Sequence, residues 1–134
     1  MQTILIVDDE QSFSYLLEVI LQRAGYQTLV ASDGKEGLEL VHQYLPHLVI
    51  LDESMPRMRG SEVYRRMKAD PMTEHIPVIM HSSAVNVRKS DLMEYNRADA
   101  FLPKPSLPRE VLDKVRRMVL TNRPTPNGAE QAAD

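Results

Sequence analysis

The sequence predicts an α/β fold with a parallel β-sheet, and three observations support this prediction. Short apolar runs alternate with stretches that repeat apolar residues at helical spacing, which is typical of strands joined by crossover helices. The run at residues 4–7 is continuously apolar and ends abruptly in acidic residues, as expected for a strand covered on both faces. Polar residues follow most predicted strands directly, at the sheet edge where such folds bind ligands.

The first half of the chain is predicted to hold three strands and two helices. The first strand, at residues 4–7, is followed by a helix whose apolar residues recur three or four positions apart: Phe13, Leu16, Leu17, Ile20 and Leu21. A second strand is expected at residues 28–31. Leu38, Val41 and Leu45 then predict the second helix, and the apolar run at residues 48–51 predicts the third strand.

The second half repeats this alternation. A third helix is marked by Val63 and Met67, and the fourth strand is expected at residues 78–80. A weaker helical pattern at residues 92–95 precedes the fifth strand, at residues 100–102. The last helix runs to about residue 119, with Pro108 in its first turn. Residues 1–121 are expected to form one domain, and residues 122–134 a disordered tail or a truncated linker without large apolar side chains.

Composition limits the classes of function. The chain has 134 residues, enough for one domain, and its net charge of −3 gives no general attraction to nucleic acid or an anionic membrane. It has no cysteine, which excludes disulfides, thiolate nucleophiles and cysteine-built metal sites. No apolar run approaches the roughly 18 residues that span a bilayer. We therefore expect a cytoplasmic domain with no membrane and no direct nucleic-acid partner.

Charged and hydroxyl side chains follow the predicted strands and should converge at one edge of the sheet. They are Asp8, Asp9 and Glu10 after the first strand, Asp52 after the third, His81, Ser82 and Ser83 after the fourth, and Lys104 after the fifth. Two carboxylates about 4 Å apart repel by roughly 4 kcal/mol at an effective dielectric constant of 20, and Mg²⁺ would relieve this repulsion. A carboxylate beside Mg²⁺ can attack phosphorus, and the ammonium and hydroxyl can hold the phosphoryl oxygens.

Four segments carry a resemblance to a known family. They are ILIVDDE at residues 4–10, LDESMPRMRG at 51–60, IPVIMHSSA at 76–84 and ADAFLPKP at 98–105. Together, and in this order, they resemble the receiver domain of two-component response regulators, including the stand-alone chemotaxis regulators. The resemblance implies a doubly wound, five-stranded parallel sheet with five helices and the flavodoxin-like strand order 2-1-3-4-5.

The resemblance also implies an acceptor and a metal site. Asp52 occupies the place of the phosphoacceptor. Asp9 occupies that of the direct Mg²⁺ ligand, while Asp8 would act through water and Asp52 would also bind the ion. The backbone carbonyl of Ser54 would be a further ligand.

Three further residues match the positions that transmit the signal in this family. Lys104 fills the place of the phosphate-pairing lysine, Ser82 that of the switch hydroxyl and Phe101 that of the switch aromatic residue. The implied partners are a sensor histidine kinase or phosphotransfer protein, an unknown downstream protein and possibly a second copy of the chain. Such a domain is a signalling module rather than an enzyme, and it would hydrolyse its own acyl phosphate slowly.

Two other functions use similar residues. A Mg²⁺-dependent phosphatase of the haloacid-dehalogenase type also has an aspartate nucleophile, but it carries Asp-x-Asp after the first strand, whereas Asp8 and Asp9 are adjacent and Asp52 follows the third strand. A phosphate-independent adaptor could keep the receiver fold. The intact acidic cluster and Lys104 argue against such an adaptor.

Overall fold

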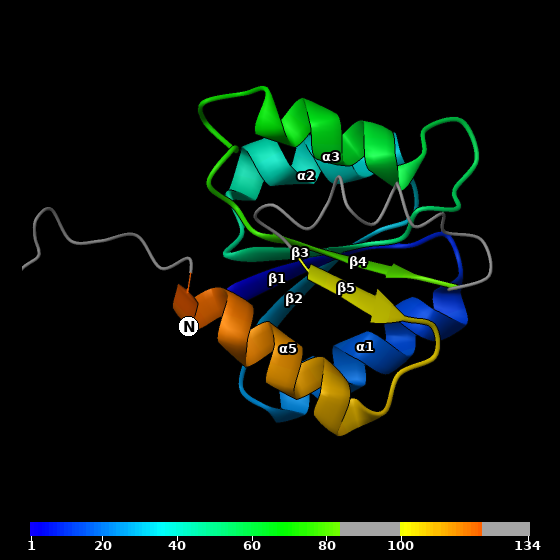
Figure 1. Ribbon diagram of the computed structural model, residues 1–134, viewed down its shortest axis with the longest axis vertical. Coiled ribbons are helices and arrows are strands. Elements are labelled where there is room, and N and C mark those ends of the chain that lie inside the picture. Colours follow the sequence, from blue (N-terminus) through cyan, green and yellow to red (C-terminus); the bar gives the residue numbers. More distant parts are fainter. Residues whose placement is uncertain (84–99, 122–134) are drawn as a thin grey trace, which may run out of the picture.

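The computed structural model describes residues 1–83 and 100–121, which form a five-stranded parallel sheet covered by helices (Figure 1). The strand order is β2-β1-β3-β4-β5, which confirms the predicted order. The strands are β1 (Thr3–Val7), β2 (Gln27–Ala31), β3 (Leu48–Leu51), β4 (Val78–Ser82) and β5 (Ala100–Pro103). The helix predicted at residues 92–95 and the tail predicted at 122–134 lie outside the described residues.

Helices cover both faces of the sheet, as the doubly wound fold requires (Figure 1). The helices α1 (Gln11–Arg23) and α5 (Pro108–Thr121) pack on one face, and α2 (Gly34–Tyr44) and α3 (Gly60–Lys68) on the other. Successive residues of a strand point to opposite faces, so each strand contributes to two cores. In β1, Leu5 and Val7 join the core under α2 and α3, whereas Ile4 and Ile6 join the core under α1 and α5. None of the helices described for residues 1–83 and 100–121 is long and apolar enough to span a bilayer.

The third strand has the predicted bounds and most other elements extend the predicted ones by one to a few residues, with two corrections near element ends. Leu45, which the sequence places in the second helix, lies just after α2 in a left-handed conformation with φ of 46°, so the helix ends at Tyr44. His81 and Ser82, expected after the fourth strand, form the last two residues of β4. The strand therefore carries Ser82 to the sheet edge directly.

A capping box fixes the start of α2. The side chain of Asp33 accepts a hydrogen bond from the amide of Glu36 at 2.8 Å, and the Glu36 carboxylate accepts one from the amide of Ser32 at 2.9 Å. In the first turns of this helix, a Cβ atom at Gly37 would lie 3.0 Å from both methyl groups of Val7. The small residue lets α2 approach β1 directly below the edge where the acidic residues stand.

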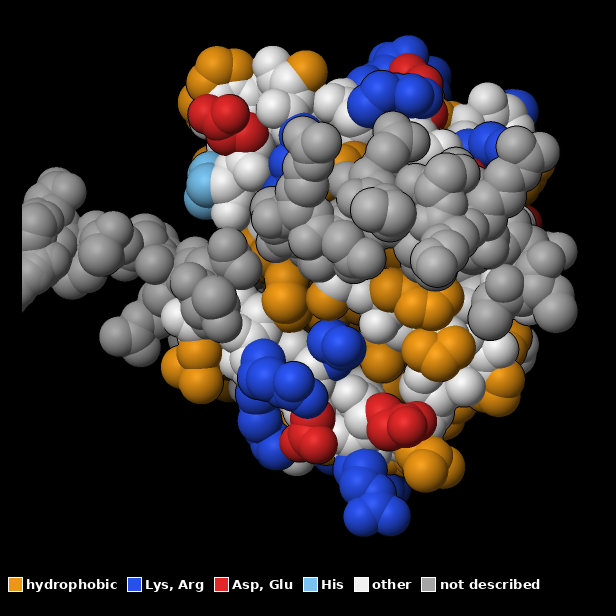
Figure 2. Space-filling view, viewed as in Figure 1, with side chains coloured by type: hydrophobic (Ala, Val, Ile, Leu, Met, Phe, Trp, Pro, Cys, Tyr) orange, Lys and Arg blue, Asp and Glu red, His pale blue; other side chains and the backbone are white. Residues whose placement is uncertain are grey.

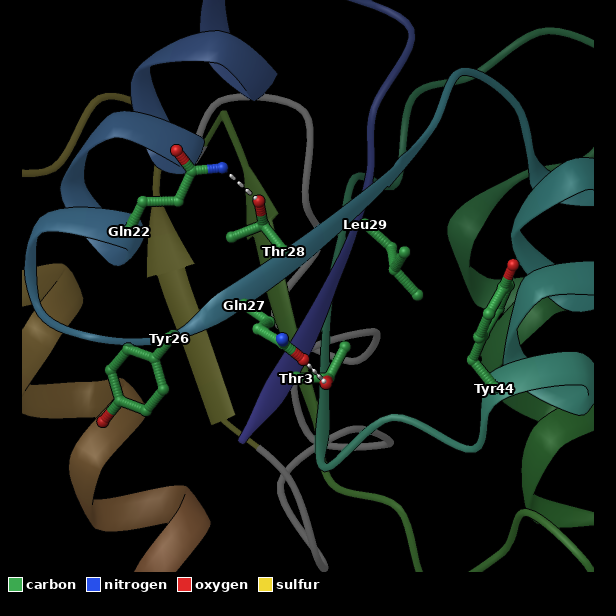
Figure 3. A pocket seen from close by; sticks show the side chains of 7 residues that line it. All are labelled: Thr3, Gln22, Tyr26, Gln27, Thr28, Leu29 and Tyr44. Atoms are coloured by element: carbon green, nitrogen blue, oxygen red, sulfur yellow. Dashed lines mark hydrogen bonds between the residues drawn. The ribbon is translucent and has the colours of Figure 1, made fainter. Parts of the chain in front are cut away.

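Two surface features lie apart from this edge. An open groove runs along the edge strand β2, where Gln22 donates to Thr28 at 2.8 Å and Thr3 donates to Gln27 at 3.2 Å (Figure 3). The groove is lined by Thr3, which begins β1 about 16 Å along the strand from Asp8, at the other end of this strand. Figure 2 shows Lys and Arg side chains over α5 with acidic side chains beside them, which gives this helix a mixed charge.

Candidate functional site

The candidate site is built at the carboxyl ends of the strands. Backbone hydrogen bonds continue the sheet pairing just beyond the strands: the amide of Asp8 donates to Ala31 at 3.0 Å and that of Asp52 to Val7 at 2.9 Å. The amide of Lys104 donates to the carbonyl of Ser82 at 3.0 Å. These bonds fix the backbone of the functional residues, and the sheet thereby holds two carboxylates and an ammonium at one edge.

The ammonium of Lys104 lies among three carboxylates. Its Nζ atom is 2.9 Å from Oδ2 of Asp8, 3.0 Å from Oε1 of Glu10 and 3.5 Å from Oδ2 of Asp52. The same atom lies over the ring of Phe13, 4.4 Å from its centroid, which is a cation–π contact. Lys104, Asp8 and Asp52 have side chains that are at most 6% exposed, so these charges interact with little screening by water.

Burial and mutual repulsion perturb the acidic groups. Burial, reinforced by the nearby charge of Asp8, raises the pKa of Asp52 to about 6 although Lys104 opposes the shift. Burial also raises the pKa of Asp8 against the effect of Lys104. Burial alone would lower the pKa of Lys104, but its contacts with Asp8 and Glu10 outweigh this effect and raise it. The site thus holds more negative charge than its one ammonium neutralises.

The donor set fits a hard divalent cation. Oxygen atoms of Asp8, Glu10 and Asp52 all lie within 4.8 Å of one another, and carboxylate oxygens are the ligands that Mg²⁺ prefers. The resemblance stated from the sequence implies a Mg²⁺ site at an acidic pocket of this kind. Burial, and after it the charge of Asp8, raises the pKa of Asp52, and a bound cation would offset both effects on the carboxylate. The residues present are therefore suited to hold Mg²⁺.

The structure does not bring all the predicted metal ligands together. The carboxylate of Asp9 is exposed and lies outside the acidic group found among the described residues. The amide of Ser54 donates to Oδ1 of Asp52 at 3.4 Å, so Ser54 adjoins Asp52. The roles of Asp9 and of the Ser54 carbonyl as ligands stay predictions. Glu10, which the sequence placed at this edge without a role in metal binding, is part of the acidic cluster.

The hydroxyl group of Ser82 lies buried at the end of β4. Ser82 is 1% exposed, and its Oγ atom has no hydrogen-bond partner within the described part of the chain. A buried hydroxyl without a partner costs about 1–3 kcal/mol, which an arriving acceptor oxygen would recover. Phe101, the predicted switch residue, lies half-buried on the neighbouring strand, packed against the core under α2 and α3. Met80 and Phe101 are register partners, so the hydroxyl and the ring belong to adjacent strands.

His81 supports the site from the opposite face of the sheet. Its ring packs edge-on against Phe13, with 6.0 Å between the ring centroids, and the Phe13 ring also makes the cation–π contact with the ammonium of Lys104. Burial, with a smaller contribution from Lys104, lowers the pKa of His81 to about 4. The imidazole is therefore neutral at pH 7, and it adds no positive charge beneath the lysine.

The loop after Asp52 is folded tightly against this residue. A Cβ atom at Gly60 would collide with the backbone carbonyl of Asp52, so no side chain fits there. The amide of Gly60 donates to the carbonyl of Glu53 at 3.0 Å, and the Glu53 carboxylate accepts a hydrogen bond from the amide of Ser61 at 2.7 Å. The first turn of α3 thereby fixes the backbone next to the acceptor.

Comparison with known proteins decides the family. Residues 4–116 match the family described as the response regulator receiver domain. The chain belongs to this family. The receiver has 33% identity over 125 residues to the DNA-binding response regulator MtrA of Mycolicibacterium smegmatis, covering 93% of the chain and 54% of that protein. It spans about half the length of the curated relatives that it matches.

Solved structures agree with this assignment. A putative response regulator from Chloroflexus aurantiacus superimposes with a TM-score of 0.80 at 30% identity, covering 89% of the receiver and 98% of that chain. The chemotaxis protein CheY4 of Vibrio cholerae superimposes with a TM-score of 0.80 at 26% identity, covering 88% and 98% of the two chains. The receiver is thus similar in fold to a chemotaxis regulator and in sequence to a DNA-binding one.

Proposed function

We propose that Asp52 of this receiver accepts a phosphoryl group from the phosphohistidine of a sensor histidine kinase or phosphotransfer protein. The observation that carries the proposal is the placement of Asp52. It is 3% exposed, it stands at the end of β3, and Lys104 and Asp8 flank it. Family membership supports the same signalling role and implies the histidine kinase partner.

The transfer balances without further reactants. A carboxylate oxygen of Asp52 attacks phosphorus, and the P–N bond to the donor breaks. The other ring nitrogen of the donor phosphohistidine already carries a proton, so the donor leaves as a neutral imidazole. Bound Mg²⁺, held by Asp8 and Asp52 with Asp9 and the Ser54 carbonyl, would neutralise charge on the phosphoryl group. Water later attacks the acyl phosphate, which releases inorganic phosphate and restores the carboxylate. We expect this self-dephosphorylation to be slow, so that the product of the domain is a signal.

The signal would pass through the residues that form new hydrogen bonds to the phosphoryl group. The phosphoryl group adds about −1.5 to −2 charges and three acceptor oxygens at neutral pH. Lys104 and the unpartnered hydroxyl of Ser82 are the donors that would bind it. Movement of Ser82 would let Phe101 turn inward on the adjacent strand. The face around β5 and α5 would then change its affinity for a downstream protein or for a second copy of the chain.

Labelling by a small phosphodonor tests the acceptor. In Mg²⁺ and acetyl phosphate, we expect wild type to gain hydroxylamine-sensitive phosphate and Asp52→Asn to gain none. Asp113→Asn removes an exposed aspartate of α5 and should label as wild type does. Hydroxylamine-sensitive phosphate retained by Asp52→Asn would show that the acceptor lies elsewhere. We place this activity in the cytoplasm, where a kinase could supply the phosphoryl group.

A further inference from the structure

Glu10 holds the ammonium of Lys104 across 94 positions of sequence, through a contact of 3.0 Å. The oxygen of Asp52 is farther from the same atom, at 3.5 Å. We propose that Glu10 is a positioning residue, which restrains Lys104 in the resting receiver and competes with the phosphoryl group on Asp52 for its ammonium. This inference rests on the proposed function, and it makes Glu10 a residue that weakens the binding of the phosphoryl group by Lys104.

The first turn of α1 fixes Glu10 in place. Its carbonyl accepts hydrogen bonds from the amides of Phe13 at 3.1 Å and Ser14 at 3.2 Å, and its own amide donates to Oδ1 of Asp8 at 2.9 Å. The ring of Phe13, from the same turn, lies 4.4 Å from the Lys104 ammonium. The start of α1 therefore contacts the lysine through a carboxylate and an aromatic face, which together define its resting position.

The competition follows from the position of the ammonium. Lys104 donates a hydrogen bond to Glu10 at 3.0 Å and makes ion-pair contacts with Asp8 at 2.9 Å and Asp52 at 3.5 Å. A phosphoryl group on Asp52 brings new acceptor oxygens, and the ammonium must weaken one of these contacts to turn toward them. The Glu10 side chain is 56% exposed, whereas that of Asp8 is 2% exposed. Water can replace the lysine only at Glu10, so the contact with Glu10 is the one that yields.

Repulsion acts in the same direction. Oxygen atoms of Glu10 and Asp52 lie within 4.8 Å of each other, and a phosphoryl group would add negative charge at that point. Glu10→Gln keeps the length and polarity of the side chain but removes its charge. This variant should therefore release Lys104 toward the phosphoryl position and bind a phosphoryl mimic more tightly.

The mimic beryllofluoride measures this effect directly. Because the chain has no tryptophan, binding is followed by ¹⁹F NMR, at Mg²⁺ concentrations high enough that more Mg²⁺ changes nothing. We expect Glu10→Gln to bind beryllofluoride about two- to five-fold more tightly than wild type, the range of an exposed ion pair. The matched control Glu39→Gln removes an exposed carboxylate from α2 and should keep the wild-type affinity.

A double-mutant cycle separates the lysine from general electrostatics. In a Lys104→Met background the gain from Glu10→Gln should shrink to less than about half of its wild-type factor, because the residues no longer compete for one ammonium. Equal gains in both backgrounds, or a Glu10→Gln affinity at or below wild type, would overturn the inference. If wild type binds beryllofluoride and Glu10→Gln changes nothing, only this inference fails. If wild type does not bind it, the proposed function fails first.

Discussion

Replacing Asp52 by asparagine should stabilise the resting receiver while it abolishes phosphorylation. Folding raises the pKa of this carboxyl from 3.8 to about 6, because the charged form is buried beside another acid. For a carboxyl whose pKa rises on folding, stability is full below the unfolded pKa of 3.8 and is lost as the pH rises through the folded pKa of about 6. Above pH 6 the Asp52 carboxylate therefore costs nearly its full share of folding free energy, and the neutral amide of Asp52→Asn removes that cost.

The size of the gain follows from the shift. A pKa shift of one unit is worth about 1.4 kcal/mol, so the rise of the Asp52 pKa from 3.8 to about 6 corresponds to a cost of about 3 kcal/mol at pH 8. The variant loses the 3.5 Å contact with Lys104, but that lysine keeps Asp8 and Glu10. We therefore expect a net gain of about 2 kcal/mol in the free energy of unfolding.

Urea denaturation followed by circular dichroism, with a chelator present, measures this gain. The difference between Asp52→Asn and wild type should be full at pH 8, fall as the pH drops through 6, and nearly vanish below pH 4. Asp113→Asn, an exposed site, should show no comparable gain. Mg²⁺ should stabilise wild type more than Asp52→Asn and so narrow the difference. A variant less stable than wild type at pH 8, or equally stabilised at pH 4 and pH 8, would refute this reasoning.

Three further predictions concern the surroundings of the acceptor and the surface. Gly60→Ala places a methyl group against the acceptor backbone, so urea denaturation should show a loss of about 1–3 kcal/mol. His42 contacts Asp70 at 2.7 Å and a carbonyl of its own helix at 2.9 Å, so both ring nitrogens donate only in the imidazolium form and its pKa is raised. The pair of His42 and Asp70 stabilises the fold below pH 6.5, and this contribution is lost as the pH rises through the raised pKa of His42. Asp70→Asn should therefore cost more stability at pH 5.5 than at pH 8.5. Equal costs at the two pH values would count against the pair. Asp9→Ala should weaken Mg²⁺ binding, measured by calorimetry, more than Asp8→Ala does, and the reverse ranking would make Asp8 the direct ligand.

The convergence of Asp52, Ser82 and Lys104 could be predicted from sequence, because each ends or follows a strand of one parallel sheet. The carboxyl ends of such strands share an edge, so the position of a residue after its strand determines its place in the site. The strand order itself came from the family resemblance rather than from periodicity. The structure confirms this order and the prediction that the strand at residues 4–7 is covered on both faces.

Other features depend on side-chain geometry that no local pattern encodes. The reach of Glu10 to Lys104 joins residues 94 positions apart, and it depends on how α1 begins. The packing of His81 on Phe13 joins a strand to a helix across the sheet face. The close approach of Gly60 to Asp52 depends on how the loop between them folds back. These contacts arise from tertiary packing. The sequence shows which residues are present, but it does not show which of them are in contact.

Chemical identification of the phosphorylated residue tests the central claim most directly. After labelling with acetyl phosphate in Mg²⁺, borohydride reduces an aspartyl phosphate to homoserine, and mass spectrometry of peptides locates the change. The account predicts homoserine at Asp52 and at no other aspartate. Homoserine at Asp8 or Asp9, or phosphate recovered on a histidine instead, would contradict it.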